Sequence, residues 1–373
     1  MNSDSSFENW KKNINGMIEK HPLQIISWEA TRKCNLNCLH CGSPSESVEL
    51  NEELSTDEII GAFHQIAEEF DMSEFRHINI TGGEPFVRKD LLTILENISQ
   101  FDFYRNIDIQ TNGMVLAENP DLYSKLKDYG VTGIGISIDG IKETHENFRR
   151  RKGSFDKVFS AAKTAVDNGL TVTVSTVAHA KNIHEIPELY ELVKQEIKPR
   201  IFRVMTLDNI GRTKENNEYL LSPKQTKEVI GFLLNEYVDK CDTYHDQKNT
   251  MVELGCGGWL GKELEGMVRP FIFHCVAGIN NMGILYDGKL AACSNIPREL
   301  GYEGDLRVDN IKDVWESKYQ KHRDMEWKKV GECNSCTEWD YCHGGPMHKR
   351  VSDGSMSDCL YKTISEDMDF RCR

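Results

Sequence analysis

The sequence contains no long apolar run, no excess of basic residues and, over much of its length, no cysteine. A membrane-spanning helix needs about 20 consecutive apolar residues. No stretch approaches that length, so no membrane partner is expected. The 45 Lys and Arg against 59 Asp and Glu give a formal charge of −14, which disfavours nucleic acid as a partner. The first residues, MNSDSSFENWKKNING, lack the basic and then apolar order of a secretory signal, so the sequence predicts a cytoplasmic protein.

Cysteine is absent between residues 42 and 240, although the chain has 12 cysteines in all. Three of them lie at positions 34–41 and nine follow from Cys241 onward. In a reducing cytoplasm they are not expected to form disulfides. The uneven distribution instead predicts metal sites near both ends and a cysteine-free scaffold between them.

Short β-branched runs alternate with amphipathic helical patterns in that scaffold. We expect six strands, at Leu23–Glu29, Phe75–Thr81, Asn106–Thr111, Gly133–Asp139, Thr171–Val177 and Arg200–Leu207. We expect helices between them, at Thr56–Phe70, Leu91–Gln100, Asn119–Asp128, Phe155–Asn168 and Ile186–Gln195. This alternation predicts an α/β fold of parallel βαβ units, a partial (β/α)6 TIM-like barrel. An open doubly wound sheet is the competing architecture.

The pattern divides the chain into four segments. Residues 1–22 form an N-terminal extension, 23–215 the core barrel, and 216–254 a connecting segment with a helix at Leu220–Lys240. From residue 255 to 373 glycine becomes dense, periodicity fades and cysteines take over. That composition is typical of a small domain held together by metal.

The first cysteine group, CNLNCLHC, contains Cys34, Cys38 and Cys41 directly after the first expected strand. In parallel barrels, functional groups collect at the C-terminal ends of the strands. Three thiols supply one ligand fewer than a tetrahedral metal site needs. On a cubane iron–sulfur cluster they would leave one iron free for an exchangeable ligand.

Three further motifs close the next strands. Thr81–Pro85 reads TGGEP, Thr111–Gly113 reads TNG, and Ser137–Gly140 reads SIDG. Paired glycines let a ligand approach the main chain closely, and a carboxylate beside them could hold an ammonium group. Each motif alone is equally well explained as a tight turn. Their recurrence at one face of the sheet favours a binding site.

In this order, CxxxCxxC, GGEP and SIDG resemble the pattern of the radical S-adenosylmethionine (SAM) enzymes, over about residues 24–207. The resemblance implies that Cys34, Cys38 and Cys41 hold a [4Fe-4S] cluster whose free iron binds SAM. Reductive cleavage of SAM would yield a 5′-deoxyadenosyl radical that abstracts hydrogen from the substrate. An external electron donor of the flavodoxin or ferredoxin type is then expected.

The same resemblance implies which residues contact SAM. They are the GGEP residues, the third-strand asparagine, the fourth-strand serine and an arginine for the carboxylate: Gly82, Gly83, Glu84, Pro85, Asn112, Ser137 and Arg149. The alternative for Arg149 is a solvated basic run with Arg150 and Arg151. His40 stands where the family often has an aromatic residue, and either stacks on adenine or is a surface histidine.

The C-terminal cysteines resemble the SPASM extension of peptide-modifying radical SAM enzymes, which carries two auxiliary clusters. The resemblance covers about residues 255–359. It implies Cys333, Cys336, Cys342 and Cys359 as ligands of one cluster, and Cys256, Cys275 and Cys293 as ligands of the other. For a CxxC pair alone, a zinc ribbon is the alternative. Because the same chain also carries the CxxxCxxC motif, one or two auxiliary [4Fe-4S] clusters are favoured over zinc.

The three-cysteine set has proline, Pro346, where the family has its fourth cysteine. Proline cannot bind iron, so this cluster is open to substrate, is completed by His343, His348 or Cys372, or is smaller or missing. Cys241 and Cys372 match nothing in the pattern and are expected to be structural thiols. Ser294 replaces an aspartate that sulfatase-maturing relatives carry, which disfavours formylglycine formation.

Two enzyme functions and one non-catalytic function are compatible with these motifs. The first is modification of a ribosomally made peptide or protein by a crosslink, thioether or oxidation. Because the stretch before Leu23 is short, leader binding would need a separate leader-peptide-binding protein or the barrel itself. The second is chemistry on a small molecule such as a tetrapyrrole side chain. The third is a non-catalytic electron carrier or zinc scaffold. Such a protein does not require the GGEP motif, so the presence of this motif argues against it.

Overall fold

The computed structural model describes residues 3–43, 52–238 and 249–365. Its strands are β1 Ile25–Thr31, β2 His77–Gly82, β3 Ile107–Thr111, β4 Val131–Ser137, β5 Thr171–Ala178, β6 Ile201–Thr206, β7 Met251–Leu254, β8 Asn281–Ile284, β9 Lys289–Ala291 and β10 Gly304–Asp305. Its α-helices are α1 Ser3–Lys20, α2 Thr56–Glu69, α3 Leu91–Ile98, α4 Met114–Glu118, α5 Leu122–Asp128, α6 Lys142–Arg149, α7 Ser154–Asp167, α8 Ile186–Glu196, α9 Pro223–Val238, α10 Ile311–Lys318, α11 Gln320–Arg323, α12 Trp339–Cys342 and α13 Leu360–Ser365.

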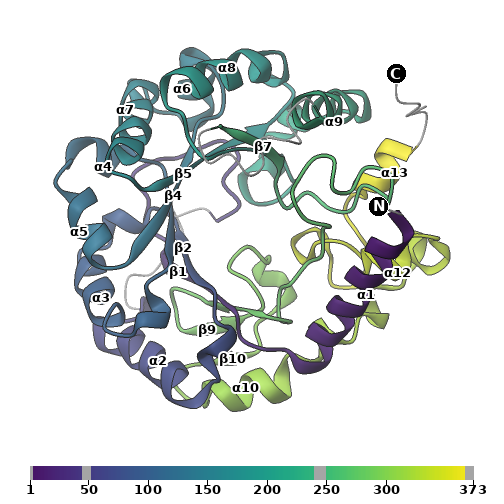
Figure 1. Ribbon diagram of the computed structural model, residues 1–373, viewed down its shortest axis with the longest axis horizontal. Helices are drawn as coiled ribbons and strands as arrows, with labels where there is room; N and C mark the ends of the chain where they lie inside the picture. Colours follow the sequence, from purple (N-terminus) through teal and green to yellow (C-terminus); the bar gives the residue numbers. More distant parts are fainter. Residues whose placement is uncertain (1–2, 44–51, 239–248, 366–373) are drawn as a thin grey trace.

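The described strands form one sheet in the order β10-β9-β8-β1-β2-β3-β4-β5-β6-β7. Strands β1 to β7 follow one another in sequence order and pair in parallel. Right-handed crossovers between successive parallel strands place every connecting helix on the same side of the sheet. Figure 1 shows these helices around the outside of a curved sheet. The partial TIM-like barrel is therefore confirmed, and the doubly wound alternative is wrong.

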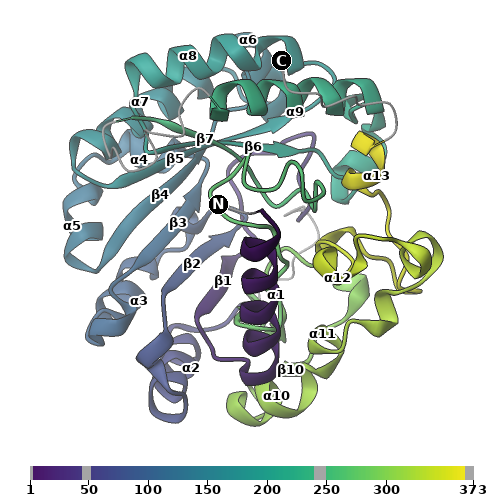
Figure 2. The ribbon, with the colours of Figure 1, turned by 45° about the vertical axis from the view of Figure 1, so that its right-hand side comes forward.

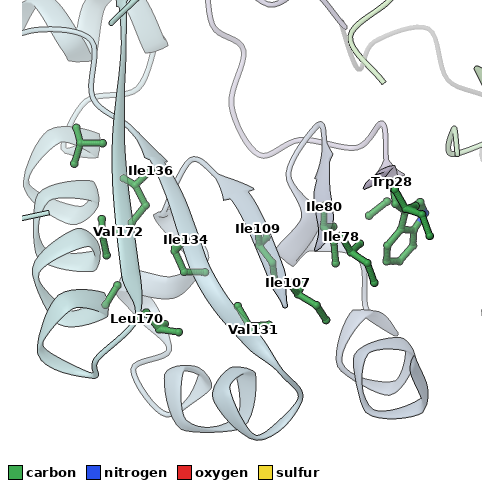
Figure 3. Packing of buried hydrophobic residues seen from close by; sticks show 14 of the residues in the cluster. Trp28, Ile78, Ile80, Ile107, Ile109, Val131, Ile134, Ile136, Leu170 and Val172 are labelled. Carbon is green, nitrogen blue, oxygen red and sulfur yellow. The ribbon is translucent and has the colours of Figure 1, made fainter. Parts of the chain in front are cut away.

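The hydrophobic core lies between the sheet and the surrounding helices. On β2 and β3 the side chains alternate, so that Ile78, Ile80, Ile107 and Ile109 are fully buried while their neighbours are only half-buried. Figure 3 shows these isoleucines with other members of the core cluster. Buried side chains of α2, including Phe63, belong to the same cluster. The alternation with period two leaves the other face of these strands to polar residues, which line the inside of the barrel.

The C-terminal segment extends the sheet rather than standing apart from it. Strand β8 pairs in parallel with β1, and β9 continues the sheet in antiparallel fashion. Helix α1 lies against the same C-terminal region (Figure 2). Its Lys11 forms an ion pair with Asp340 of α12. None of the helices in the described ranges is both long and apolar enough to cross a membrane.

Candidate functional site

The loop that follows β1 carries Cys34, Cys38 and Cys41 at the C-terminal end of the sheet. Its backbone is tied to two other segments. The Leu39 N–H donates to the carbonyl oxygen of Phe148 at 3.0 Å, and the Arg212 N–H donates to the carbonyl oxygen of Cys41 at 3.0 Å. These bonds to Phe148 and Arg212 hold the loop in place. The positions of its three thiols are therefore set by other parts of the protein as well as by the loop itself.

The surroundings of the thiols suit a cluster. The Leu36 N–H donates to the Cys34 Sγ at 3.4 Å, and the Arg149 guanidinium lies 3.7 Å from the Cys38 Sγ. Burial raises the pKa of the Cys34 thiol to about 11 and also raises that of Cys38. Such thiols stay protonated at neutral pH unless a metal binds them, since coordination deprotonates a thiol. Three cysteine sulfurs on one loop, two of which have an N–H donor nearby, fit an iron–sulfur cluster.

The two glycines at the end of β2, Gly82 and Gly83, are required by the cysteine loop itself. A Cβ on Gly82 would lie 2.2 Å from the Thr31 carbonyl oxygen, and one on Gly83 would lie 2.2 Å from that of Lys33. The Gly83 and Glu84 N–H groups donate to these same oxygens, at 2.7 and 2.8 Å. The sequence predicts that a ligand approaches these glycines closely. In this structure the backbone of residues 31–33, just before Cys34, makes that close approach. Contact of Gly82, Gly83 and Pro85 with SAM stays a prediction.

The Glu84 side chain is fully buried and accepts hydrogen bonds from within the protein. Its two oxygens accept from the Thr111 hydroxyl and the Asn112 N–H, each at 2.7 Å, and from the Phe86 N–H at 3.2 Å. Burial raises the pKa of this carboxyl, and these donors oppose the rise. The carboxylate thus joins the ends of β2 and β3. The ammonium contact expected of it stays a prediction.

Asn112 and Ser137 occupy the neighbouring strand ends. The Asn112 amide donates to the Asn35 side chain at 2.7 Å and lies 3.8 Å from the Cys34 Sγ. It therefore links the end of β3 to the cysteine loop. Ser137 ends β4 and is half-buried. Both residues lie at the expected edge of the sheet, and their contacts with SAM stay predictions.

Arg149 is buried, so the solvated basic run is wrong for this residue. Its Nε donates to the Asp139 Oδ2 at 2.5 Å, and its Nη1 points to the Cys38 Sγ. Asp139 also accepts from the Val177 N–H at 2.9 Å. Burial alone would raise the pKa of Asp139, but the positive charge of the Arg149 guanidinium lowers this pKa to about 2. The arginine is thus held by a protein carboxylate beside a predicted cluster ligand. Sequence reasoning gave Asp139 no role, although its place in SIDG was a usable signal.

His40 stacks within the protein, so its interpretation as a surface histidine is wrong. Its ring lies 4.3 Å from that of Phe148, with 7° between the planes, and His179 packs against the Phe148 ring at 4.0 Å. The His40 Nδ1 is buried with no hydrogen-bond partner. Phe148 covers one face of the imidazole. Stacking of adenine on the other face stays a prediction.

The buried imidazoles of His145 and His179 predict a pH-dependent stability. Burial lowers the pKa of each to about 4, and for His145 the Arg149 charge adds to this effect. Between pH 4 and 6.5 the unfolded chain therefore binds more protons than the folded chain, so stability falls as pH falls. Each group contributes up to about 1.4 kcal/mol per pH unit in this window.

Anaerobic urea unfolding at pH 7.5, 6.5 and 5.5 measures this effect. His179→Phe keeps a ring against Phe148 and removes one titrating group, so its stability should fall less steeply below pH 6.5. Equal slopes for the two proteins would show that His179 takes up a proton while folded.

The four C-terminal cysteines predicted as one ligand set lie near one another. Burial, and next the thiols of Cys359, Cys333 and Cys336, raise the pKa of Cys342 to about 12. The buried Arg350 guanidinium lies 3.5 Å from the Cys333 Sγ. Sequence reasoning missed this arginine, because nothing in its sequence neighbourhood marks it. The structure thus brings the set together, and its role as ligands stays a prediction.

The three-cysteine set is also brought together. Desolvation, and next the thiols of Cys275 and Cys293, raise the pKa of Cys256. The Met347 N–H donates to the Cys275 Sγ at 3.4 Å, which places the neighbouring Pro346 at this set. Pro346, which stands where the family has its fourth cysteine, therefore lies next to the three cysteines that lack a fourth ligand.

The alternative fourth ligands are placed as follows. His348 is 3.1 Å from the Asp208 carboxylate, an ion pair that occupies its Nε2. His343 Nδ1 is 3.1 Å from His274 Nε2. Cys372, like Cys241, lies outside the described residues. Neither histidine is shown as a ligand by these contacts.

The zinc alternative concerns the same C-terminal cysteines. Within residues 3–43, 52–238 and 249–365, no three Cys, His, Asp or Glu side chains are placed to hold a single metal ion. A zinc ribbon needs four ligands around one ion, whereas each cysteine of a cubane binds a different iron.

Two family models match the chain. The model of the radical SAM superfamily matches residues 28–193, and that of SPASM, an iron–sulfur cluster-binding domain, matches residues 275–337. The first range contains the cysteine loop and the motifs that close β2, β3 and β4. The second contains four of the seven C-terminal cysteines predicted as ligands, Cys275, Cys293, Cys333 and Cys336.

Curated relatives match most of the chain. AdoMet-dependent heme synthase of Methanosarcina barkeri is 27% identical, over 91% of this chain and 97% of its own length. PqqA peptide cyclase of Rhizobium meliloti is 27% identical, over 87% and 82%. The mitochondrial GTP 3′,8-cyclase of Arabidopsis thaliana is 30% identical, over 74% and 68%. These relatives act on different kinds of substrate.

Solved structures share the fold. Streptococcus suis SuiB bound to S-adenosylmethionine superimposes with a TM-score of 0.68 at 16% identity, over 93% of this chain and 80% of that one. Native anSMEcpe with bound AdoMet gives 0.68 at 20% identity, over 92% and 95%. At these identities the likeness concerns the fold alone.

Proposed function

Because this chain belongs to the radical SAM superfamily and carries a SPASM domain, we propose that it modifies a ribosomally made peptide or protein. It is an enzyme, and its cofactors are a [4Fe-4S] cluster with SAM, together with auxiliary iron–sulfur clusters. When bound, the cluster and SAM supply a one-electron cleavage that gives a 5′-deoxyadenosyl radical for hydrogen abstraction. The proposed modification is a crosslink, a thioether or an oxidation.

We assign the residues of the first site as follows. Cys34, Cys38 and Cys41 hold the cluster. Backbone groups of Gly82, Gly83, Glu84 and Pro85, with Asn112 and Ser137, line the place of SAM. Arg149 is the proposed partner of the SAM carboxylate, and it also positions the cysteine loop, because Asp139 holds it beside the Cys38 sulfur. These side chains mainly position and shield the reacting atoms, and this function requires no acid–base pair.

The observation that carries the proposal is Pro346 beside Cys275. Cys256, Cys275 and Cys293 supply three thiols to the first auxiliary cluster, and Pro346 supplies no fourth. An iron–sulfur cluster with three cysteine ligands has one iron to which a cysteine or another polar group of a peptide can bind. Such binding would hold a flexible peptide near the radical.

Two proteins like this chain act on peptides. SuiB, which shares the fold, has been solved with its precursor peptide SuiA, and PqqA peptide cyclase is a relative over most of the chain. We propose a peptide partner on the same grounds. An external electron donor and a separate leader-binding protein complete the proposed partners.

A small-molecule substrate is the second candidate. AdoMet-dependent heme synthase aligns over 97% of its own length, which favours a tetrapyrrole with carboxylate side chains. Such a substrate would need no leader-binding protein. The two candidates share the first site and differ in the substrate that enters the barrel and in the need for a leader-binding protein.

Anaerobic reconstitution with iron, sulfide, SAM and dithionite tests the function. We expect 5′-deoxyadenosine to form, and to form faster when the true substrate is present. A short-peptide library and an iron porphyrin with propionate side chains are supplied in parallel. A rate increase with the porphyrin alone would overturn the peptide proposal, and absence of 5′-deoxyadenosine under all conditions would contradict both candidates.

A further inference from the structure

Helix α6 and the three residues that follow it carry a basic surface in a protein whose formal charge is −14. Its cations, Lys142, Arg150, Arg151 and Lys152, are all exposed. They line a surface hollow of about 500 Å³ together with Glu143, Glu146 and Asn147. Lys142 also forms an ion pair with Asp156 at 2.5 Å. The remaining three cations are consecutive in sequence. We call these four cations the basic surface.

The basic surface lies directly behind the cysteine loop. Phe148 and Arg149, the last two residues of α6, face inward. The Phe148 carbonyl oxygen accepts from the Leu39 N–H at 3.0 Å, and the Arg149 Nη1 lies 3.7 Å from the Cys38 Sγ. Arg150, the next residue, is exposed on the other side of the same turn. One turn of helix therefore separates solvent from a predicted cluster ligand.

The backbone at Arg150 is unusual for an arginine. This residue ends α6 in the left-handed conformation, with φ of 55°. Glycine is the common residue at such a helix end because a side chain is disfavoured there. The arginine thus adds charge to this surface at a cost in backbone conformation.

We propose that the basic surface binds an acidic electron-transfer protein, which delivers the electron that SAM cleavage needs. The inference rests on the proposed function and adds the docking site of the electron donor. One electron leaves the reduced cofactor of the partner and enters the cluster held by Cys34, Cys38 and Cys41; no bond forms or breaks at this surface. Opposite charges speed the encounter of such partners, whose interfaces are small and short-lived.

The test compares two double charge reversals with the same change in net charge. Arg151→Glu with Lys152→Glu alters the basic surface. Lys125→Glu with Lys318→Glu alters two exposed lysines on α5 and α10. Reconstituted wild type and both variants are titrated with an acidic flavodoxin, and 5′-deoxyadenosine formation is driven either by that flavodoxin with its reductase and NADPH or by dithionite.

We expect the Arg151/Lys152 variant to bind flavodoxin more weakly and to lose roughly tenfold or more of the flavodoxin-driven rate at low salt. Its dithionite-driven rate should equal that of wild type. The difference should shrink as salt rises, because salt screens exposed charges. The Lys125/Lys318 variant should behave like wild type in every assay.

Equal flavodoxin binding by the two variants would overturn the proposal, and so would an equal loss with dithionite, which would indicate damage to the cysteine loop. Competition by a polyglutamate peptide as strong as by flavodoxin would overturn it in favour of an acidic peptide. If wild type forms no 5′-deoxyadenosine with dithionite, the proposed function fails. The binding titration then still decides whether the basic surface is the docking site.

Discussion

Replacing Cys34, Cys38 and Cys41 together by serine is expected to abolish SAM cleavage and to leave the C-terminal iron in place. Serine is nearly the size of cysteine but is a poor ligand for iron, so the cluster between β1 and α6 is lost while the backbone bonds of its loop remain. The variant should contain roughly four iron atoms fewer per chain, the content of one cubane. Formation of 5′-deoxyadenosine should fall by roughly a thousandfold or more, because the reaction without a catalyst is slow. Iron analysis and chromatography measure the two quantities.

The matched control replaces three cysteines at the other end of the chain, Cys333, Cys336 and Cys359, by serine. This variant removes ligands of the second auxiliary cluster and should keep the cleavage of SAM in the presence of dithionite. Cleavage that survived the first replacement and vanished with the second would contradict the assignment of the two cysteine groups.

Gly83→Ala is expected to disable the same site without touching a cysteine. Its new Cβ would lie 2.2 Å from the Lys33 carbonyl oxygen and 2.6 Å from that of Arg32. Because both obstacles are backbone atoms, the loop must move. Overpacking of this kind destabilises a protein by about 1–3 kcal/mol. Displacement of the reacting groups by a fraction of a bond length or more lowers the rate of 5′-deoxyadenosine formation, by roughly a hundredfold for a shift near 1 Å.

Gly61→Ala is the control for this substitution. Gly61 lies within α2, and nothing lies within 4 Å of the position that its Cβ would take. Alanine there should raise the free energy of unfolding by about 0.5–1 kcal/mol, as expected inside a helix, and should leave SAM cleavage unchanged. Thermal unfolding and the cleavage assay compare the two variants. A Gly83→Ala protein with the wild-type rate would show that the contact between GGEP and the cysteine loop does not position the cluster.

The barrel strands were predictable because they are long, β-branched and buried. Strand β5, expected at Thr171–Val177, is observed at Thr171–Ala178, and helix α2, expected at Thr56–Phe70, is observed at Thr56–Glu69. In both elements the apolar residues recur with the period of the element and lie on the side that faces the core. In the structure, a capping box formed by Ser55 and Glu58 stabilises the start of α2.

The elements that were missed are short or polar. Strands β7 and β8 have four residues each, too few for alternation to stand out, and they form because the edges of the sheet are available to them. Helix α6, with the sequence KETHENFR, has a weak apolar side and reads as a charged loop. Its contacts with the cysteine loop stabilise it, and they involve residues more than 100 positions away.

The candidate site likewise has a part that the sequence predicted and a part that it did not. Motif order placed Cys34, Gly83 and Asn112 at one edge of the sheet, as the structure has them. Motif order could not show that Glu84 joins two strand ends or that Asp139 holds Arg149. Those contacts depend on which side chain is buried, and burial follows from packing across the whole sheet.

The most direct measurement is electron paramagnetic resonance of the dithionite-reduced protein, with and without SAM, compared between wild type and the Cys34/Cys38/Cys41 triple serine variant. We predict a signal that is present in wild type, absent in the variant and altered when SAM is added, because SAM binds the iron that these three cysteines leave open. A wild-type spectrum in which no signal depends on the three cysteines, or in which their signal does not respond to SAM, would contradict this assignment of the site.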